Sequence, residues 1–519
     1  MSDIPLVLPA FVCIPLVAAF LLPILGSFGR KGRVVATALA NLAALSLLAM
    51  SIASTNQFSV YNVGRWSIPL GINMVLDGFS ALFLITVNLV SSAALLFSVR
   101  YMEQYTAKPK YLSLFMLMVA GMNGVVLTGD LFNLFVFLEV ASIASYALVG
   151  FGCDDEQLEA SFKYMVLGEV GSMFILLAIG LVYGATGMLN MAYISKAIQN
   201  NPTNVVLCFA LALFIAGFGL KAALVPFHAW LPDAHSSAPA PISAMLSGIL
   251  IKVLGVYALV RTIFSIFGIS TTVGTLLVVL GVVNMVTGAF LAIGQGDLKR
   301  LLAYSSISQV GYIFLGIGLG GALLAAGASP VWASLAILGG LFHLLNHAVS
   351  KSLLFLTSGS VEMAAGTRQL DQLGGLAEKL PLTRASCAVA SASIVGIPPF
   401  GGFWSKLILV IAAIGAGVYW AAALIVAVSV CTLIMYLKVH RYVFLGELSE
   451  TRQQIKESRG SMAVAMICLA CLCVFLGLVF LAPALRAELL EPAAKVLCDG
   501  VGYADKIMEF SKDMIVCAD

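Results

Sequence analysis

Eight ionisable side chains interrupt the long apolar stretches of this sequence. They are Glu139, Glu169, Lys221, Lys252, His343, His347, Lys351 and Lys406. On insertion scales, a charge near the centre of a membrane helix costs about 2.5–3.5 kcal/mol. Eight such groups together cost more than a fold tolerates without using them. Because all of them can gain or lose a proton, their types predict a proton relay.

The spacing of three of these residues supports this prediction. His343, His347 and Lys351 follow one another at intervals of four residues, which places them on one face of a helix. A lone buried histidine is often only a satisfied hydrogen-bonding group, and a lone lysine can extend its ammonium to the membrane surface. A stripe of three titratable groups is more typical of a proton path.

The lysines suit a relay because their charge depends on their surroundings. Burial favours the neutral amine, whereas a nearby carboxylate favours the ammonium. Glu139 follows a polar break at Asp130 by nine residues and is the candidate partner of Lys221. The sequence does not show whether the two side chains touch.

Two of the apolar stretches contain helix breakers. The first stretch contains Pro226, five residues after Lys221. The second stretch contains, shortly before Lys406, four breakers, which are Pro398, Pro399, Gly401 and Gly402. Proline removes an intrahelical hydrogen bond, and non-helical backbone survives in a bilayer only where protein or water covers it. We therefore expect two broken helices, each with a lysine nearby.

The composition sets the class of protein. Of the 519 residues, 61% are hydrophobic and 10% are charged, and the mean hydropathy is +1.03. Soluble domains have about 45–50% apolar and about 25% charged residues. This excludes a soluble enzyme, and the formal charge of +3 does not suggest a nucleic-acid partner.

The chain is predicted to be an all-α integral membrane protein with about fourteen transmembrane helices. Each needs about 20 apolar residues. The candidate spans are 4–25, 33–54, 76–99, 111–129, 130–152, 162–185, 204–226, 241–266, 270–294, 299–321, 330–361, 385–417, 418–443 and 461–482.

The two broken spans are the seventh and the twelfth, which suggests an internal repeat. Spans four to eight and nine to thirteen form two sets of five. Because each set has an odd number of spans, the second set is oriented in the membrane opposite to the first. We expect N-terminal helices in 1–110, one repeat in 111–266, the other in 267–443, and a last helix with an amphipathic tail in 444–519. The tail is expected on the membrane surface, with a disordered tail as the alternative.

The basic residues predict the orientation. Loops after odd-numbered spans carry 16 Lys and Arg, whereas loops after even-numbered spans carry three, which are Arg65, Lys196 and Arg261. Such an excess is typical of the cytoplasmic side. We therefore expect a multi-pass protein of the cell membrane with both termini outside the cytoplasm.

No residue pattern predicts a cofactor or a resident metal. Cys468, Cys471 and Cys473 have a spacing that superficially resembles an iron–sulfur motif, but they lie within an apolar span without other ligands. The chain has neither a dinucleotide-binding fingerprint nor a phosphate-binding loop. We expect no catalytic or redox site in this chain.

Four motifs resemble one family of membrane proteins. They are DLFNLFVFLE (130–139), KAALVPFHAWLPDAH (221–235), HLLNHAVSK (343–351) and PFGGFWSK (399–406). They resemble the antiporter-like proton-translocating subunits. This family includes the large membrane subunits of complex I, subunits of Mrp cation/proton antiporters and the membrane arms of energy-converting hydrogenases. The residues at 130–151 are most similar to the D-type subunits of Mrp antiporters.

The resemblance implies roles for these residues. Glu139 and Lys221 would form a coupled pair, Lys252 and the two histidines would continue a central polar axis, and Lys406 would end it. Some complex I subunits have glutamate at the position of Lys406. This chain therefore resembles those subunits less. We expect the row to lie near the midplane without long apolar gaps.

The expected function is proton translocation within a multisubunit ion-pumping complex. The resemblance implies further membrane subunits as partners, including other antiporter-like subunits, and allows a hydrophilic redox arm. Three alternatives remain open, namely a subunit of an Mrp-type Na⁺/H⁺ antiporter without redox partners, a transporter that works alone, and a structural scaffold whose charges are inert. The sequence distinguishes neither H⁺ from Na⁺ nor one complex from another.

Overall fold

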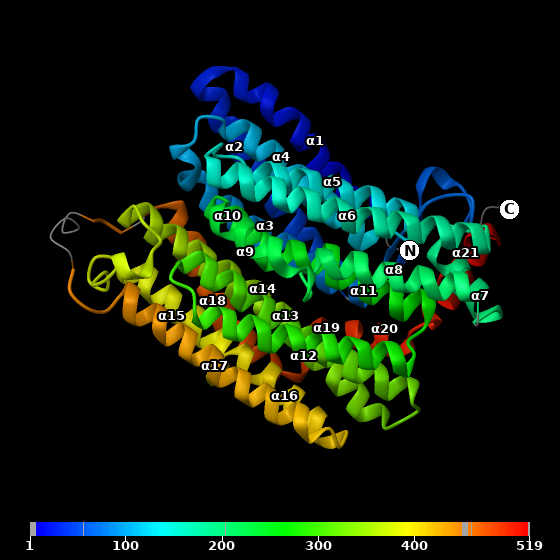
Figure 1. Ribbon diagram of the computed structural model, residues 1–519. Coiled ribbons are helices and arrows are strands. Elements are labelled where there is room, and N and C mark those ends of the chain that lie inside the picture. Colours follow the sequence, from blue (N-terminus) through cyan, green and yellow to red (C-terminus); the bar gives the residue numbers. More distant parts are fainter. Residues whose placement is uncertain (1–6, 56, 203, 449–454, 458, 517–519) are drawn as a thin grey trace.

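Long helices packed side by side make up the described part of the chain (Figure 1). The structure is a computed structural model and describes residues 7–55, 57–202, 204–448, 455–457 and 459–516. Twelve helices in these ranges are long and apolar enough to cross a membrane, and two further apolar helices are shorter. Because the short ones belong to broken spans, the fourteen predicted spans are present. Residues 4–6 of the first predicted span lie outside the described residues.

Most spans begin and end within several residues of their predicted bounds, but the seventh continues to Ser237, beyond its predicted end at 226. The first six are α1 (Ala10–Ser27), α2 (Gly29–Ala53), α3 (Gly78–Tyr101), α4 (Lys108–Leu127), α5 (Leu131–Val149) and α6 (Asp155–Thr186). The seventh comprises α8 (Val205–Lys221) and α9 (Trp230–Ser237). The eighth comprises α10 (Ala240–Met245), η5 (Leu246–Leu250), η6 (Lys252–Tyr257), α11 (Ala258–Arg261) and η7 (Thr262–Phe267). The others are α12 (Thr271–Ile293), α13 (Leu298–Ala325), α14 (Pro330–Ala365), α15 (Pro381–Val395) with α16 (Gly401–Gly415), α17 (Tyr419–Val443) and α18 (Ser461–Leu481).

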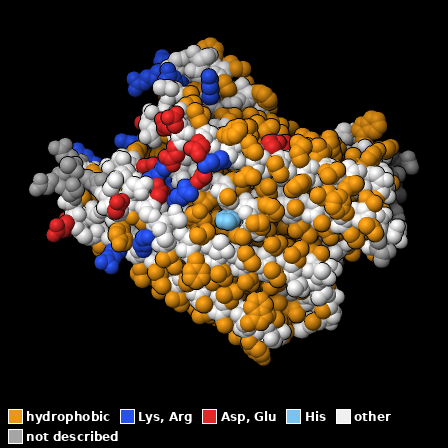
Figure 2. Space-filling model, viewed as in Figure 1, with side chains coloured by type: hydrophobic (Ala, Val, Ile, Leu, Met, Phe, Trp, Pro, Cys, Tyr) orange, Lys and Arg blue, Asp and Glu red, His pale blue; other side chains and the backbone are white. Residues whose placement is uncertain are grey.

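We name the two ends of the bundle after its loops. The odd-loop end holds the loops after odd-numbered spans, and the even-loop end holds the others. Charged side chains gather at the odd-loop end, at the left of Figure 2, while apolar side chains cover most of the remaining visible face. The core lies around the eighth span, in which every residue from Ala240 to Ile266 is buried.

Matching N-terminal caps relate the two halves of the chain. The Asp130 side chain accepts a hydrogen bond from the backbone at the start of α5, and Asp297 does the same at the start of α13. Each cap also pairs, as an isolated β-bridge, with a residue two helices further on. Asp130 pairs with Asn190, and Asp297 pairs with Gln369. Such paired features indicate a structural repeat.

The helices before the two bridges also end alike. Gly187 caps the C-terminus of α6 and Gly366 caps that of α14, each in the left-handed conformation that favours glycine and each three residues before the bridge. The first bridge lies at the even-loop end and the second at the odd-loop end. The repeat is therefore inverted, as predicted from the number of spans.

A buried ion pair fixes the even-loop end of the eighth span. The Arg261 guanidinium donates to both carboxylate oxygens of Asp77, at 2.7 and 2.8 Å, and lies 5.0 Å from the Tyr503 ring. Arg261 is one of the three even-loop cations on which the predicted orientation depends, but it is buried. The even-numbered loops thus present fewer free cations than the sequence suggested, which strengthens the charge asymmetry.

Two small elements were not predicted from the sequence. β1 (Ser59–Asn62) and β2 (Asn73–Leu76) form an antiparallel hairpin between α2 and α3. The short helix α7 (Met191–Asn200) lies at the even-loop end, at the right of Figure 1. The fold remains helical within the membrane.

The C-terminal tail packs on the bundle. It forms α19 (Pro483–Leu489), α20 (Glu491–Asp499) and α21 (Gly502–Val516), and α20 contacts α3 and α14. Its apolar side chains at Leu490, Ala493 and Leu497 are buried. The predicted amphipathic tail is thus helical, but protein rather than the membrane surface covers the apolar side of α20.

Candidate functional site

Glu139 and Lys221 form an ion pair between α5 and α8. Nζ of Lys221 lies 3.7 Å from Oε1 of Glu139, and the two side chains are 3% and 16% exposed. Glu139 also accepts a hydrogen bond from the Ser172 hydroxyl of α6. The structure thus supplies the contact that the sequence left open.

Two hydroxyl groups complete the surroundings of the Lys221 ammonium. It donates to Oγ of Ser142 at 3.0 Å and to the Tyr146 hydroxyl at 3.2 Å. Glu139, Ser142 and Tyr146 follow at intervals of three and four residues, so they lie on one face of α5. An ammonium has three hydrogens to donate. One face of α5 therefore provides two hydrogen-bond acceptors for the ammonium and, in Glu139, its counter-charge.

The seventh span is interrupted directly after Lys221, as predicted. α8 ends at this lysine, and Ala223 has a φ of +54°. That conformation is strained for a residue with a Cβ atom. The chain becomes helical again in η4 (Phe227–Ala229), just after Pro226. Lys221 therefore lies where regular backbone hydrogen bonding stops.

Side chains from elsewhere hold the freed backbone of this break. The Trp230 indole donates to the Leu220 carbonyl at 3.1 Å. The Asn284 side chain of α12 accepts from the Val225 amide at 2.6 Å. Buried backbone groups need such partners in the absence of water. The break is thus a built feature rather than a simple proline kink.

The twelfth span is broken in the same way. α15 and α16 are separated by a segment that contains Pro399, and Gly396 in this segment has a φ of +94°. Gly396 precedes Pro399 by three residues, as Ala223 precedes Pro226. The second break thus has glycine at the left-handed position, where the first has a strained alanine.

Lys406 folds back over the twelfth-span break. Its ammonium donates to the carbonyl oxygens of Ile394 and Val395, both at 3.0 Å, and lies 4.9 Å from the centre of the Tyr312 ring. The last carbonyls of a helix lack intrahelical partners. Lys406 caps α15 as Trp230 caps α8. The free carbonyls at the end of α15 thus orient this ammonium.

His343 lies next to Lys406. Its Nδ1 is 3.0 Å from Oγ of Ser405, and its Nε2 is 3.0 Å from Oε1 of Gln309. Its ring centre is 5.1 Å from that of Tyr312, the ring that also contacts Lys406. Tyr312 and Ser405 therefore connect the histidine to the lysine at the second break.

His347 stacks on His343 but has no hydrogen-bond partner. The ring centres are 6.4 Å apart and the planes are nearly parallel. Neither ring nitrogen of the buried His347 has a partner within the described part of the chain. Unpaired buried polar atoms are rare, and a site that exchanges water or protons explains them. Lys351, one turn further on, donates to the Leu302 carbonyl at 2.9 Å and the Tyr436 hydroxyl at 3.0 Å.

Lys252 occupies a π-helical part of the eighth span. It is fully buried, begins η6, and donates to the Ser247 carbonyl. Ser247 in turn bonds Ser306 of α13 at 2.7 Å. π-Helical turns are frequent at functional sites. The sequence identified Lys252 but gave no sign of the irregular backbone around it.

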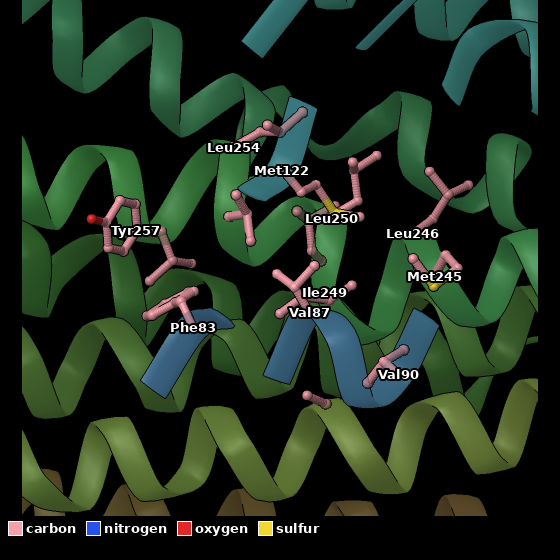
Figure 3. Close-up of a cluster of buried hydrophobic side chains, with 14 of the residues drawn as sticks. Phe83, Val87, Val90, Met122, Met245, Leu246, Ile249, Leu250, Leu254 and Tyr257 are labelled. Atoms are coloured by element: carbon pink, nitrogen blue, oxygen red, sulfur yellow. The ribbon is translucent and has the colours of Figure 1, made fainter. Parts of the chain in front are cut away.

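Apolar packing on the other side of the eighth span holds Lys252 in place. Figure 3 shows Leu246, Ile249 and Leu250 of η5 among side chains of α3, including Val87 and Val90. α13 and α14 are on the side of Ser247 and Lys252. There, Lys252 lies close enough for its charge to act on both His343 and His347.

His235 belongs to the same cluster, although sequence reasoning did not select it. It is fully buried in α9, its ring centre lies 5.2 Å from that of Phe355, and neither ring nitrogen has a partner among the described residues. The charges of Lys252 and Lys351 reach it. The sequence did offer one sign of this role, because His235 is the last residue of the motif at 221–235.

Another ion pair lies near the odd-loop end, close to the end of α9. Nζ of Lys299 lies 2.6 Å from Oε2 of Glu362 and donates to the Ala238 carbonyl at 3.1 Å. Ala238 follows α9, three residues after His235. Lys299 is buried, whereas the Glu362 side chain is 27% exposed. In the sequence, Lys299 resembles an ordinary loop cation and gives no sign of this burial.

The site residues thus form two groups. Glu139 and Lys221 make one, while Lys252, the histidines and Lys406 make the other, with Lys351 beside it. No hydrogen bond or ion pair between described residues joins Lys221 to Lys252. Their segments do pack closely, since Gly255 of η6 lies against Ala222. A continuous row between the two groups stays a prediction.

The described residues contain no group of three or more His, Cys, Asp or Glu arranged to hold a metal ion. The cysteine motif also does not converge, because Cys468 and Cys471 are exposed on α18 while Cys473 is buried. The site is instead made of lysines, histidines, hydroxyls and the carboxylates of Glu139 and Glu169, both of which act on Lys221. Such groups bind and release protons.

Comparison with known proteins places this geometry in a family. Residues 128–433 match the family model described as NADH:quinone oxidoreductase/Mrp antiporter, and residues 61–112 match complex I chain 5 N-terminus. The chain belongs to this family. It is an antiporter-like proton-translocating subunit of the superfamily that includes complex I, Mrp antiporters and membrane-bound hydrogenases.

Individual relatives agree with this placement. The chain is 36% identical to the N subunit of NADH-quinone oxidoreductase from Desulforudis audaxviator, with 86% of each protein covered. It is 33% identical to the D subunit of the Na⁺/H⁺ antiporter from Alkalihalophilus pseudofirmus, with 88% of this chain and 89% of the relative covered. A chain of the Mrp complex from Dietzia sp. superposes with a TM-score of 0.87 at 30% identity, covering 97% and 99%. The expected similarity to the D-type antiporter subunits is thus matched by a similarity to the N subunit of the oxidoreductase.

Proposed function

We propose that this chain carries protons from the Glu139–Lys221 pair through Lys252 and the histidines to Lys406. The observation that carries the proposal is the ion pair between the buried Lys221 and the partly buried Glu139 at a helix break. A carboxylate and two hydroxyls hold the ammonium there, so its protonation depends on whether Glu139 stays charged and in place. Family membership supports proton transport as its use.

The proposed cycle begins with a change at Glu139. When a neighbouring subunit neutralises or moves this carboxylate, Lys221 loses its counter-charge and releases a proton. Lys252 accepts the proton, through water where direct hydrogen-bond reach is exceeded. His343 and His347 then connect Lys252 to Lys406, which the carbonyls of Ile394 and Val395 hold at the second break.

Glu139 variants test the coupling step. Glu139→Gln removes the charge while keeping most of the shape, and we expect proton uptake to fall by about tenfold or more. Glu139→Asp keeps the negative charge on a side chain that is one methylene group shorter. We therefore expect it to lower proton uptake less than Glu139→Gln. The measurement is initial proton uptake, by a pH-sensitive dye, in vesicles containing the assembled complex. Wild-type uptake with both variants would remove the pair from the pathway.

The odd-loop end faces the cytoplasm in this proposal. The support is the excess of Lys and Arg in its loops and the burial of Arg261 at the other end. Cysteines introduced at Arg65 and Lys110 test it in intact cells with a membrane-impermeant thiol reagent. Only the cysteine at position 65 should react above the background of the parent protein; reaction only at 110 would reverse the orientation.

We place the chain in a complex with other antiporter-like membrane subunits, and any redox group lies in a partner. The multisubunit setting of the similar Mrp chain supports this placement. Na⁺/H⁺ exchange is the second candidate, favoured by the similarity to a Na⁺/H⁺ antiporter subunit. The subunits that co-migrate on a native gel decide between them: NADH-dehydrogenase or hydrogenase subunits indicate a redox-driven pump, and antiporter subunits alone indicate exchange.

A further inference from the structure

A surface cavity far from the proton site opens at the odd-loop end. It has a volume of about 590 Å³ and lies between α2 and the turn from α3 to α4. One wall is a single face of α2, with Arg30, Arg33, Val34 and Ala38. The other wall includes Lys108, at the first turn of α4. Neither the proposed pathway nor the internal repeat uses this cavity.

The charged end of the cavity is basic and unpaired. Arg30, Arg33 and Lys108 line it with a single acid, Glu103. Within the described part of the chain, none of these four side chains is in an ion pair. The Lys108 ammonium donates only to the Val99 carbonyl, at 2.5 Å, and keeps hydrogens to donate. The cavity therefore has an excess of positive charge and open donors.

The position of the cavity fits a lipid rather than a free ion. Lys and Arg side chains gather over the odd-loop end of α1 and α2, at the top of Figure 2. Along α2, the wall changes from Arg30 and Arg33 to uncharged side chains, which are Val34, Thr37, Ala38 and Asn41. Beyond it the exposed side chains are apolar, as at Leu42, which is 65% exposed. A headgroup at the basic end would direct its acyl chains along this apolar surface into the bilayer.

We propose that this cavity binds the phosphate headgroup of an anionic phospholipid. Guanidinium groups bind phosphate oxygens in pairs of hydrogen bonds, and basic pockets between transmembrane helices bind anionic headgroups. A free phosphate would use the basic end but not the apolar surface of α2 beyond the cavity. The ligand is thus an anionic lipid held at the edge of α2 and α4.

Titration of the delipidated complex with phosphatidylglycerol tests the proposal by native mass spectrometry. Each basic residue near a membrane surface changes lipid affinity about fivefold, so the variant Arg30→Gln, Arg33→Gln, Lys108→Gln should bind about a hundredfold more weakly at its tightest site. A control variant removes three exposed cations elsewhere, with Arg65→Gln, Arg384→Gln and Lys495→Gln. It should bind like wild type. If the triple variant fails to assemble, Arg33→Gln alone should weaken binding about fivefold.

Three results would overturn the proposal. Equal binding of phosphatidylglycerol by wild type and the triple variant would show that the cavity is not the site. Displacement of the lipid by inorganic phosphate at equal concentration would assign it to a free anion. Loss of a partner subunit from the otherwise intact triple-variant complex would identify a protein contact. Wild-type preference for phosphatidylglycerol over phosphatidylcholine, lost in the triple variant, supports it.

Discussion

Lys221→Ala should abolish proton translocation while the complex still assembles. Its ammonium is the only basic group among the described residues in contact with Glu139, and Ser142 and Tyr146 cannot replace it as a proton carrier at neutral pH. Loss of a positioned acid–base group reduces such a step by about a hundredfold or more. The measurement is initial proton uptake in vesicles with equal amounts of assembled complex.

Lys221→Arg separates charge from proton exchange. Arginine keeps the positive charge beside Glu139 but stays protonated in proteins. If Lys221 must release a proton, the arginine variant should fail like the alanine variant. Lys110→Ala, at an exposed position of the odd-loop end, is the matched control and should transport normally. Near-normal uptake by an assembled Lys221→Ala complex contradicts the assigned role.

Lys406→Gln should also stop proton uptake, by about a hundredfold or more. Lys406 has two roles in the structure, because it caps the carbonyls of Ile394 and Val395 and lies beside the His343 cluster. Glutamine has an amide that can donate hydrogen bonds to these carbonyls, but it cannot exchange a proton. The variant therefore keeps the cap and removes the carrier.

The thermal midpoint of the purified complex distinguishes these two roles. Lys406→Gln should unfold near the wild-type temperature, whereas Lys406→Met leaves the carbonyls without a donor and should unfold earlier. If Lys406 had only a structural role, Lys406→Gln would instead take up protons at close to the wild-type rate. Both variants are compared in the same vesicles, with the same dye.

The charged positions and both broken spans were predictable because the bilayer makes each of them costly. A lysine or a proline at membrane depth needs a partner, and Lys221, Lys406, Pro226 and Pro399 all stand out against apolar neighbours for that reason. The contact between Glu139 and Lys221 required the structure, since nothing local relates α5 to α8. Asp130 was visible as a polar break, but its bridge to Asn190 and the matching bridge between Asp297 and Gln369 were not.

Other features depend on tertiary packing and left little sign in the sequence. The π-helical turns around Lys252 arise where the eighth span packs on all sides. Arg261 resembles a loop cation in the sequence because its partner Asp77 lies 184 residues away. The tail was expected on the membrane because an amphipathic face does not reveal what covers it. His235 was not selected because one histidine without a spaced partner resembles an ordinary buried one.

Lys252 tests the continuous pathway most directly, because the proposed pathway enters the second group of site residues through this lysine. Lys252→Met leaves the Glu139–Lys221 pair and the Lys406 cap in place and removes only the proposed link. The measurement is proton uptake by vesicles containing the assembled Lys252→Met complex. We predict a loss as complete as that of Lys221→Ala, about a hundredfold or more. Uptake at the wild-type rate would contradict a single row and leave two separate charged sites.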